Sequence, residues 1–235
     1  MGAQPSHTLS LRDVRFSWPG TGAFGIEVPQ LDLASGESAM LLGQSGSGKS
    51  TLLSLICGIV LPDSGDVAVI GQKISALRPS ARDRFRAETI GLVFQQFNLL
   101  PYASVADNIL LPLRFAPARR ARVDDPLREA ARLCRALDLP EAALGQSAGR
   151  LSVGQQQRVA VARALIGAPP LIVADEPTSA LDAETQTAFL DLLFAQVRAV
   201  GASLLMVSHD PRLGARFDRV LQISTIVRPL SRPTS

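Results

Sequence analysis

Apolar residues recur along this chain in short runs that alternate with longer helical patterns. Residues 9–16, 24–33 and 38–42 have the apolar, β-branched content of strands, and similar short runs occur at 67–70, 91–94, 171–174, 203–207 and 220–223. Helical spacing is found after Gly48 and over 183–200, whereas 104–144 is rich in Ala, Leu and Arg. The repetition of strand, helix and strand predicts an α/β fold with a parallel sheet and a helical insertion.

A glycine-rich loop follows the strand expected at 38–42. It reads GQSGSGKST and consists of Gly43, Gln44, Ser45, Gly46, Ser47, Gly48, Lys49, Ser50 and Thr51. This is the pattern G-x-x-x-x-G-K-[ST], in which glycines let backbone N–H groups approach a phosphate chain at a helix N-terminus. Lys49 then supplies a positive charge, Ser50 a hydroxyl for Mg²⁺ and Thr51 a further phosphate contact. The alternative, an accidental glycine turn before a helix, is disfavoured by the preceding apolar strand and by Lys49 and Ser50.

Two carboxylates end the strand expected at 171–174, in the segment LIVADEPTSALD. Asp175 is placed to act on Mg²⁺, usually through a water, as the acidic partner of a P-loop. Glu176 follows outside the dry strand, where a base is needed beside a γ-phosphate. The alternative is a pair of solvated carboxylates at a strand end, which the glycine-rich loop upstream disfavours.

A second anion site is predicted by residues 151–160, which read LSVGQQQRVA. Ser152 and Gly154 stand at the start of an apolar-striped helix, whose N-terminal N–H groups attract anions. Since a nucleotide already has the glycine-rich loop, one chain contains two half-sites for phosphate. The two motifs together resemble those of the ATP-binding subunit of an ATP-binding-cassette (ABC) transporter, and the resemblance covers nearly all 235 residues.

The resemblance implies a P-loop NTPase core with a mainly parallel sheet, an N-terminal antiparallel β subdomain and an inserted α-helical subdomain. Residues 1–235 would form one ABC ATPase domain, with 1–94 and 156–235 as the nucleotide-binding core and 95–155 as the helical subdomain that carries the signature segment, residues 151–155. Two such chains, arranged head to tail as a homodimer, would complete two ATP sites. ATP and Mg²⁺ are the implied cofactors.

The resemblance also assigns roles to single residues. Glu176 would be the general base, and His209, after the strand LLMV, would contact the γ-phosphate. Gln95 would sense Mg²⁺ and the attacking water, with Gln96 as a competitor for that role. The remaining nucleotide contacts would be Trp18, stacked on adenine, the signature residues Ser152, Gly154 and Gln155, and Asp182, which communicates across the dimer.

Val153 departs from the usual signature LSGGQ. A valine would be strongly disfavoured if that position required a positive φ. We expect the substitution to be tolerated.

Composition and charge indicate the class of protein and where in the cell it would act. Hydrophobic residues make up 46% and charged residues 19%, with a net charge of +3, which is typical of a globular protein. Neither a membrane-spanning run nor a secretory signal is expected, so the resemblance implies a peripheral protein at the cytoplasmic face of the inner membrane. Arg119, Arg120 and Arg122 predict a solvated loop or, alternatively, a contact with lipid headgroups or a partner. No nucleic-acid partner is expected.

The branch of the family is indicated by FQQFNLLPYASVADNILLPL, residues 94–113, which resembles the lipoprotein-release and macrolide-export branch. In that branch the ATPase energises a permease, which would dock on the helical subdomain. Phe97, Leu99, Leu100 and Tyr102 are candidate contacts or, equally, packing residues of that subdomain. Two other functions stay open: the ATPase of a solute importer, and a cell-division-type module that regulates cell-wall hydrolases without transport.

Overall fold

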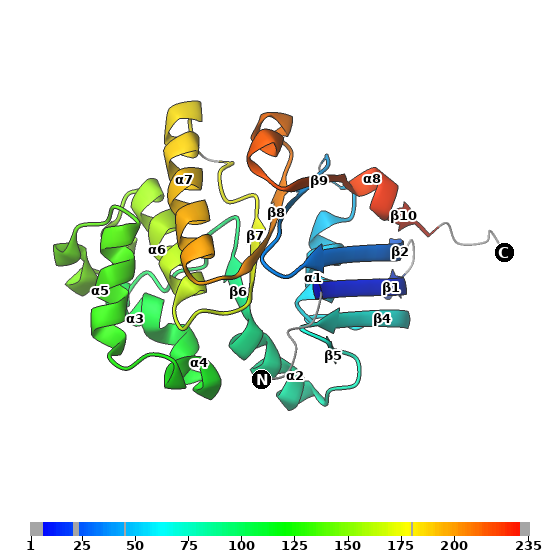
Figure 1. The fold of residues 1–235 in the computed structure, drawn as a ribbon, viewed down its shortest axis with the longest axis horizontal. Coiled ribbons are helices and arrows are strands. Elements are labelled where there is room, and N and C mark those ends of the chain that lie inside the picture. The colour runs from blue at the N-terminus through cyan, green and yellow to red at the C-terminus, as the bar shows by residue number, and fades with distance from the viewer. Residues whose placement is uncertain (1–6, 21–23, 45, 180, 231–235) are drawn as a thin grey trace. The chain divides into compact units, whose positions relative to one another are not determined.

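The computed structural model describes residues 7–20, 24–44, 46–179 and 181–230. The chain divides into two compact units: Met1–Arg86 with Leu205–Ser235, and Ala87–Leu204. Helix α2 (Pro79–Thr89) and strand β8 (Ser203–Ser208) pass from one unit to the other. Figure 1 shows the fold and labels helices and strands of both units where there is room.

The first unit contains a five-stranded sheet in the order β10-β2-β1-β4-β5, with every pairing antiparallel. The strands are β1 (His7–Ser17), β2 (Gly25–Ala34), β4 (Ser64–Val69), β5 (Gln72–Lys73) and β10 (Arg228–Pro229). Leu9 and Leu11 of β1 are fully buried and pair with Leu33 and Leu31 of β2. The N-terminal antiparallel subdomain implied by the sequence is therefore confirmed.

The same unit holds the parallel pair β3 (Ser38–Leu42) and β9 (Arg219–Gln222) and the helix α1 (Lys49–Ile56). Leu52, Leu53, Leu55 and Ile56 of α1 are buried, as the helical spacing predicted, whereas Ile59, predicted to be buried with them, lies beyond α1 and is 55% exposed. Two further predictions need correction here. The strand expected at 220–223 ends at Gln222, because α8 (Ile223–Ile226) begins directly after it. Helix α2 was not predicted, because it buries none of its residues and its sequence therefore has no apolar stripe.

The second unit contains the parallel pair β6 (Ile90–Val93) and β7 (Leu171–Asp175), in register from Ile90–Leu171 to Val93–Ala174. Ahead of β7 the chain is helical: α3 (Val105–Leu110), η1 (Leu111–Arg114), α4 (Pro117–Ala121), α5 (Pro126–Ala136), η2 (Glu141–Gly145), η3 (Ala148–Arg150) and α6 (Val153–Leu165), with α7 (Ala183–Ala199) following β7. Helices α3 and α5 begin with side-chain caps, Ser104 and Asp125 respectively. The α/β fold with a helical insertion is therefore confirmed.

Helix α6 packs closely on β6, because a Cβ at Gly91 would collide with the backbone at Ala164. Its C-terminal end is held by Arg119, whose side chain is 1% exposed and donates hydrogen bonds to the carbonyl oxygens of Ala164, Ile166 and Ala87. Burial lowers the pKa of Arg119 to about 10, which leaves it protonated at neutral pH. The prediction of a solvated loop is therefore wrong for Arg119, since the last carbonyls of a helix attract a cation inward.

Candidate functional site

In the first unit the glycine-rich loop connects β3 to α1. Gly46 has φ +80° and Gly48 has φ +92°, both in the left-handed region that favours glycine. Gly48 is the N-cap of α1 and offers no side-chain hydrogen bond to the helix. The N-cap residue of α1 therefore provides no side chain to satisfy the first N–H groups of the helix. N–H groups at a helix start attract anions, so this helix start is suited to phosphate. Ser45 lies outside the described residues.

Lys49 lies against the loop that precedes it. Its side chain is largely buried, and Nζ donates to the carbonyl oxygens of Gly43 at 2.7 Å and Gln44 at 3.0 Å. Ser47 Oγ donates to the same Gln44 carbonyl at 2.8 Å. The ammonium charge is therefore concentrated at the loop, while Ser50 in the first turn of α1 is exposed.

Trp18 is brought to α1 by a side-chain hydrogen bond. Its Nε1 donates to Thr51 Oγ1 at 3.1 Å, and its ring meets Phe16 edge-on with centroids 5.1 Å apart. The residue is 41% exposed, so it presents aromatic surface near the start of α1. Phe24, equally exposed, lies near the glycine-rich loop, since a Cβ at Gly48 would lie 3.5 Å from its ring. Sequence reasoning missed Phe24, because a phenylalanine beside a strand carries no specific signal.

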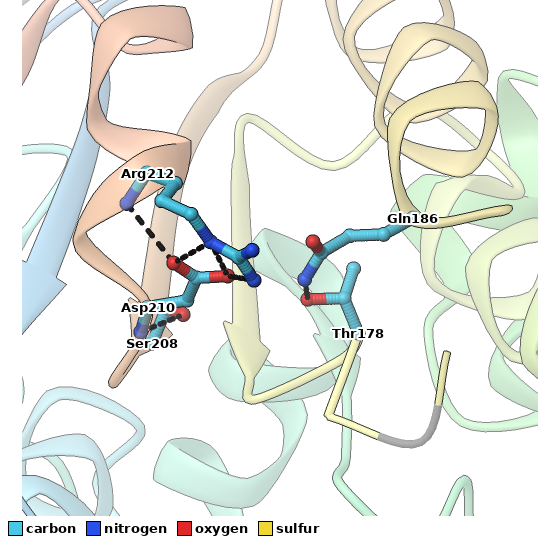
Figure 2. A network of polar contacts seen from close by, with 5 residues as sticks. All are labelled: Thr178, Gln186, Ser208, Asp210 and Arg212. Atoms are coloured by element: carbon cyan, nitrogen blue, oxygen red, sulfur yellow. Dashed lines mark hydrogen bonds and ion pairs between the residues drawn. The ribbon is translucent and has the colours of Figure 1, made fainter. Parts of the chain in front are cut away.

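His209 is exposed and follows β8 in the first unit. The residues around it are tightly bonded, as Figure 2 shows. Asp210 N donates to Ser208 Oγ at 3.1 Å, while Arg212 donates to both carboxylate oxygens of Asp210, through Nε at 2.9 Å and Nη2 at 2.7 Å. The hydrogen bonds from Arg212 lower the pKa of Asp210, so this carboxyl stays ionised and fixes the backbone that carries His209.

In the second unit, Asp175 ends β7 and Glu176 follows with φ +43°. A left-handed backbone costs a residue with a Cβ roughly 1–2 kcal/mol, so the surrounding structure must hold it. The next two residues are anchored by buried glutamines. Gln157 Nε2 of α6 donates to the carbonyl oxygen of Pro177, and Gln186 Nε2 of α7 donates to Thr178 Oγ1 at 3.0 Å, the second contact drawn in Figure 2.

Gln95 lies in an exposed turn just after β6, closed by a hydrogen bond from Phe97 N to Phe94 O at 3.0 Å. Because β6 and β7 are parallel and in register, Gln95 and Asp175 follow the same edge of the sheet. Gln96 is exposed as well, so the choice between the two glutamines stays a prediction. Sequence reasoning missed Arg163 of α6, which is 8% exposed and donates to the carbonyl oxygens of Phe97 and Asn98.

The signature segment forms the start of α6. Ser152 is the N-cap: its Oγ accepts from Gln155 N at 3.3 Å, while Gln155 Oε1 accepts from Ser152 N at 3.0 Å. Val153 is the first helical residue, with a φ outside the left-handed region, and is 52% exposed. A Cβ at Gly154 would meet nothing within 4 Å. Valine at position 153 therefore imposes no backbone strain, as expected.

Asp182 caps α7. Its Oδ1 accepts from Thr185 N at 2.9 Å, and this hydrogen bond lowers the pKa of the carboxyl. The capping role was not predicted, although an aspartate three residues before Thr185 at a helix start is a usual N-cap signal.

The candidate contacts of the helical insertion differ in exposure. Phe97 is 9% exposed and packs inside, whereas Tyr102 is 81% exposed.

Over the described residues, no helix is long and apolar enough to cross a membrane.

This chain is similar in sequence and in fold to known proteins. A family model described as "ABC transporter" matches residues 26–179. An uncharacterized ABC transporter ATP-binding protein of Mycobacterium tuberculosis (strain H37Rv) is 43% identical over 227 residues, covering 95% of this chain and 88% of that protein. The lipoprotein-releasing system ATP-binding protein LolD of Anaeromyxobacter dehalogenans is 44% identical over 193 residues, covering 82% and 80%. The ATP-binding cassette MJ0796, solved as a dimer in a post-hydrolysis state bound to ADP and Pi, superposes with a TM-score of 0.75 at 33% identity, covering 91% of this chain and 93% of that one.

Proposed function

Because this chain belongs to the ABC transporter family and is an ATP-binding and ATP-hydrolysing subunit, we propose that it powers a membrane permease by ATP-driven closure of a dimer. The observation that carries the proposal is the presence of two helix starts suited to phosphate in one chain, at Gly48 and at Ser152. One belongs to each compact unit, and in the proposal each supplies part of a nucleotide site. We assign the activity to export or lipoprotein extraction, which the similarity to LolD supports.

Nucleotide binding starts from the first unit. The N–H groups of the glycine-rich loop and the ammonium of Lys49 hold the phosphates, and Trp18 provides an exposed aromatic surface for adenine. In the proposed site, Ser50, Asp175 and Gln95 supply oxygen atoms, which are the ligands that Mg²⁺ prefers. Mg²⁺ is commonly bound by only a few protein ligands when substrate phosphates supply the others. When bound, Mg²⁺ neutralises charge that develops on the phosphate oxygens.

In the proposed hydrolysis, each catalytic residue has a separate role. The carboxylate of Glu176 accepts a proton from water as the water oxygen bonds to the γ-phosphorus and the bond from that phosphorus to the bridging oxygen breaks, giving ADP and Pi. His209 donates a hydrogen bond to a γ-phosphate oxygen, and Gln95 orients the water.

The second helix start serves a partner chain. In a head-to-tail homodimer, Ser152, Gly154 and Gln155 of one chain face the γ-phosphate on the other, and Asp182 links the two sites. Loss of the γ-phosphate then separates the chains. Residues 95–155 act as the helical subdomain on which the permease docks, with exposed Tyr102 as a contact, while 1–94 and 156–235 form the core. The complex would hold the chain at the cytoplasmic face of the inner membrane.

The test is a pull-down of tagged Glu176→Gln protein from native membranes in the presence of ATP, followed by mass spectrometry. The substitution retains the shape of the side chain and removes the base, so the ATP-bound dimer should accumulate with its permease. A permease with a large extracytoplasmic domain supports the proposal. A multi-span permease with a solute-binding receptor would reassign the chain to import, and recovery of cell-wall hydrolase regulators would reassign it to that control.

A further inference from the structure

The chain segment that follows Glu176 is held from two helices by buried glutamine side chains. Gln157 of α6 is 1% exposed and donates from Nε2 to the carbonyl oxygen of Pro177. Gln186 of α7 is 8% exposed and donates from Nε2 to Thr178 Oγ1 at 3.0 Å. The two acceptors belong to the two residues directly after Glu176, so both bonds act on the same short stretch of backbone (Figure 2 shows the second).

Backbone turns form part of this stretch: Ser179 N donates to the carbonyl oxygen of Glu176 at 3.2 Å, and Leu181 N donates to that of Thr178 at 3.1 Å. Glu176 has φ +43°, a conformation that residues with a Cβ rarely adopt. Pro177 has no N–H group, so its carbonyl oxygen is the one backbone atom through which it can be anchored by a hydrogen bond. Gln157 donates to that atom. The two glutamines therefore add contacts from outside the segment to the turns that it forms itself.

We propose that Gln157 and Gln186 are positioning residues for Glu176, which keep its carboxylate in the orientation needed to accept the proton from water. The inference rests on the proposed role of Glu176 as the base. Gln157 lies on the same helix as Ser152, and a helix moves as a rigid element. A shift of the signature segment is thus transmitted through Gln157 to Pro177, so the position of α6 determines the orientation of the Glu176 carboxylate.

The two acceptors differ chemically, which gives a direct test. A carbonyl oxygen can only accept a hydrogen bond, whereas the hydroxyl of Thr178 can donate as well as accept. In Gln157→Glu, an ionised carboxylate has no proton to give to Pro177, so the bond is lost. In Gln186→Glu, Thr178 can donate to the new carboxylate, so the bond is kept with its direction reversed. Gln157→Met and Gln186→Met retain similar volume, and each loses the one hydrogen bond that its glutamine makes.

The experiment measures ATP turnover and ATP affinity of the full-length chain for all four variants at mildly alkaline pH. We expect kcat to fall by about tenfold or more in Gln157→Met, Gln157→Glu and Gln186→Met, since small misplacement of a catalytic group is costly. Gln186→Glu should stay within about threefold of the parent, and the Kd for ATP should change little in every variant, because neither glutamine is assigned to the nucleotide.

The pH profile separates positioning from packing. Only a protonated carboxyl can donate to Pro177, so the ratio of kcat in Gln157→Glu to that in Gln157→Met should rise as the pH is lowered. Equal losses in all four variants, or a flat ratio, would mean that the glutamines serve packing alone and would overturn the inference. Turnover at the parent rate in both methionine variants would overturn it as well.

Two controls keep the result interpretable. Thermal unfolding identifies any variant that fails to fold, and the Gln186→Glu and Gln186→Met pair still decides the question if position 157 proves intolerant. Glu176→Gln is measured alongside. If Glu176→Gln keeps turnover, the assignment of the base fails; if it abolishes turnover while the methionine variants are normal, only the positioning role fails.

Discussion

Helices α1 and α6 each begin with a sequence motif suited to phosphate, yet their starts are built in different ways. The N-cap of α1 is Gly48, in a left-handed conformation and without a side-chain hydrogen bond to the helix. The N-cap of α6 is Ser152, in an extended conformation and joined to Gln155 by a reciprocal pair of hydrogen bonds. The start of α1 thus has no side-chain cap, whereas that of α6 has part of its N–H capacity satisfied by its own side chains.

The difference explains why the two motifs cannot exchange roles. Beside α1, Lys49 brings a full positive charge to the loop, so that helix start can bind phosphate unaided. Helix α6 has no acidic residue in its first turn, but it also has no cation there, and part of its N–H capacity is used by Ser152. Such a site contributes to a nucleotide that is already held elsewhere, which is what the proposed dimer requires.

The largest expected effect separates the two helix starts by affinity. Lys49→Ala removes the ammonium that we propose contacts two phosphate groups; two such charge-assisted contacts are worth about 3 kcal/mol together, so ATP should bind roughly a hundredfold more weakly. Isothermal titration with ATP measures the loss. The matched control is Lys73→Ala, at the other lysine of the chain, which pairs with Asp66 at an exposed position and should leave affinity unchanged. Unaltered ATP affinity in Lys49→Ala would contradict the role of the loop.

A second experiment compares alanine at the glycine of each helix start. Gly48→Ala forces a Cβ into a left-handed residue and to 3.2 Å from Ile26, so the free energy of unfolding should fall by about 1–2 kcal/mol. Gly154→Ala lies in a helical conformation with open space, so the same substitution should leave stability unchanged or raise it by up to ~1 kcal/mol. Urea unfolding of both variants gives the difference. Equal destabilisation would show that the two glycines have equivalent surroundings.

Removing the cap of α6 should have a smaller effect. Ser152→Ala breaks the reciprocal pair with Gln155 and should lower the free energy of unfolding by about 1 kcal/mol, as N-cap losses do. ATP binding to the single chain should persist, while ATP-dependent dimerisation, followed by light scattering, should weaken. Ser152→Thr keeps an acceptor oxygen and serves as the control. Normal dimerisation in the alanine variant would remove Ser152 from the proposed site.

The smallest effect is expected at Val153. Val153→Gly restores the usual signature, but the backbone there is already helical, so ATP turnover should change by less than about twofold. Stability should fall by no more than about 0.5 kcal/mol, because glycine is the poorer helix former. Steady-state turnover and urea unfolding check both values. A large gain in turnover would mean that the valine side chain obstructs the partner's nucleotide.

Much of the fold could be predicted because strands and motifs have local signals. The strand predicted at 9–16 lies within β1, the helical spacing after Gly48 is found in α1, and Ser38–Leu42 coincides with the predicted strand. Helix α2 could not be predicted from an apolar stripe, since it buries no residue. Gln157, Gln186 and Arg163 also escaped notice, because each bonds to a residue outside its own helix and leaves no periodic pattern in the sequence.

The inward orientation of Arg119 changes how the charge of this chain should be counted. Its guanidinium serves three carbonyl dipoles through separate nitrogen atoms, a geometry that the single ammonium of a lysine cannot reproduce. The densest run of arginines in the sequence therefore presents less positive potential to its surroundings than its composition suggests. The formal charge of +3 is therefore a poor guide to how positive the surface at residues 119–122 is toward a membrane or a partner protein.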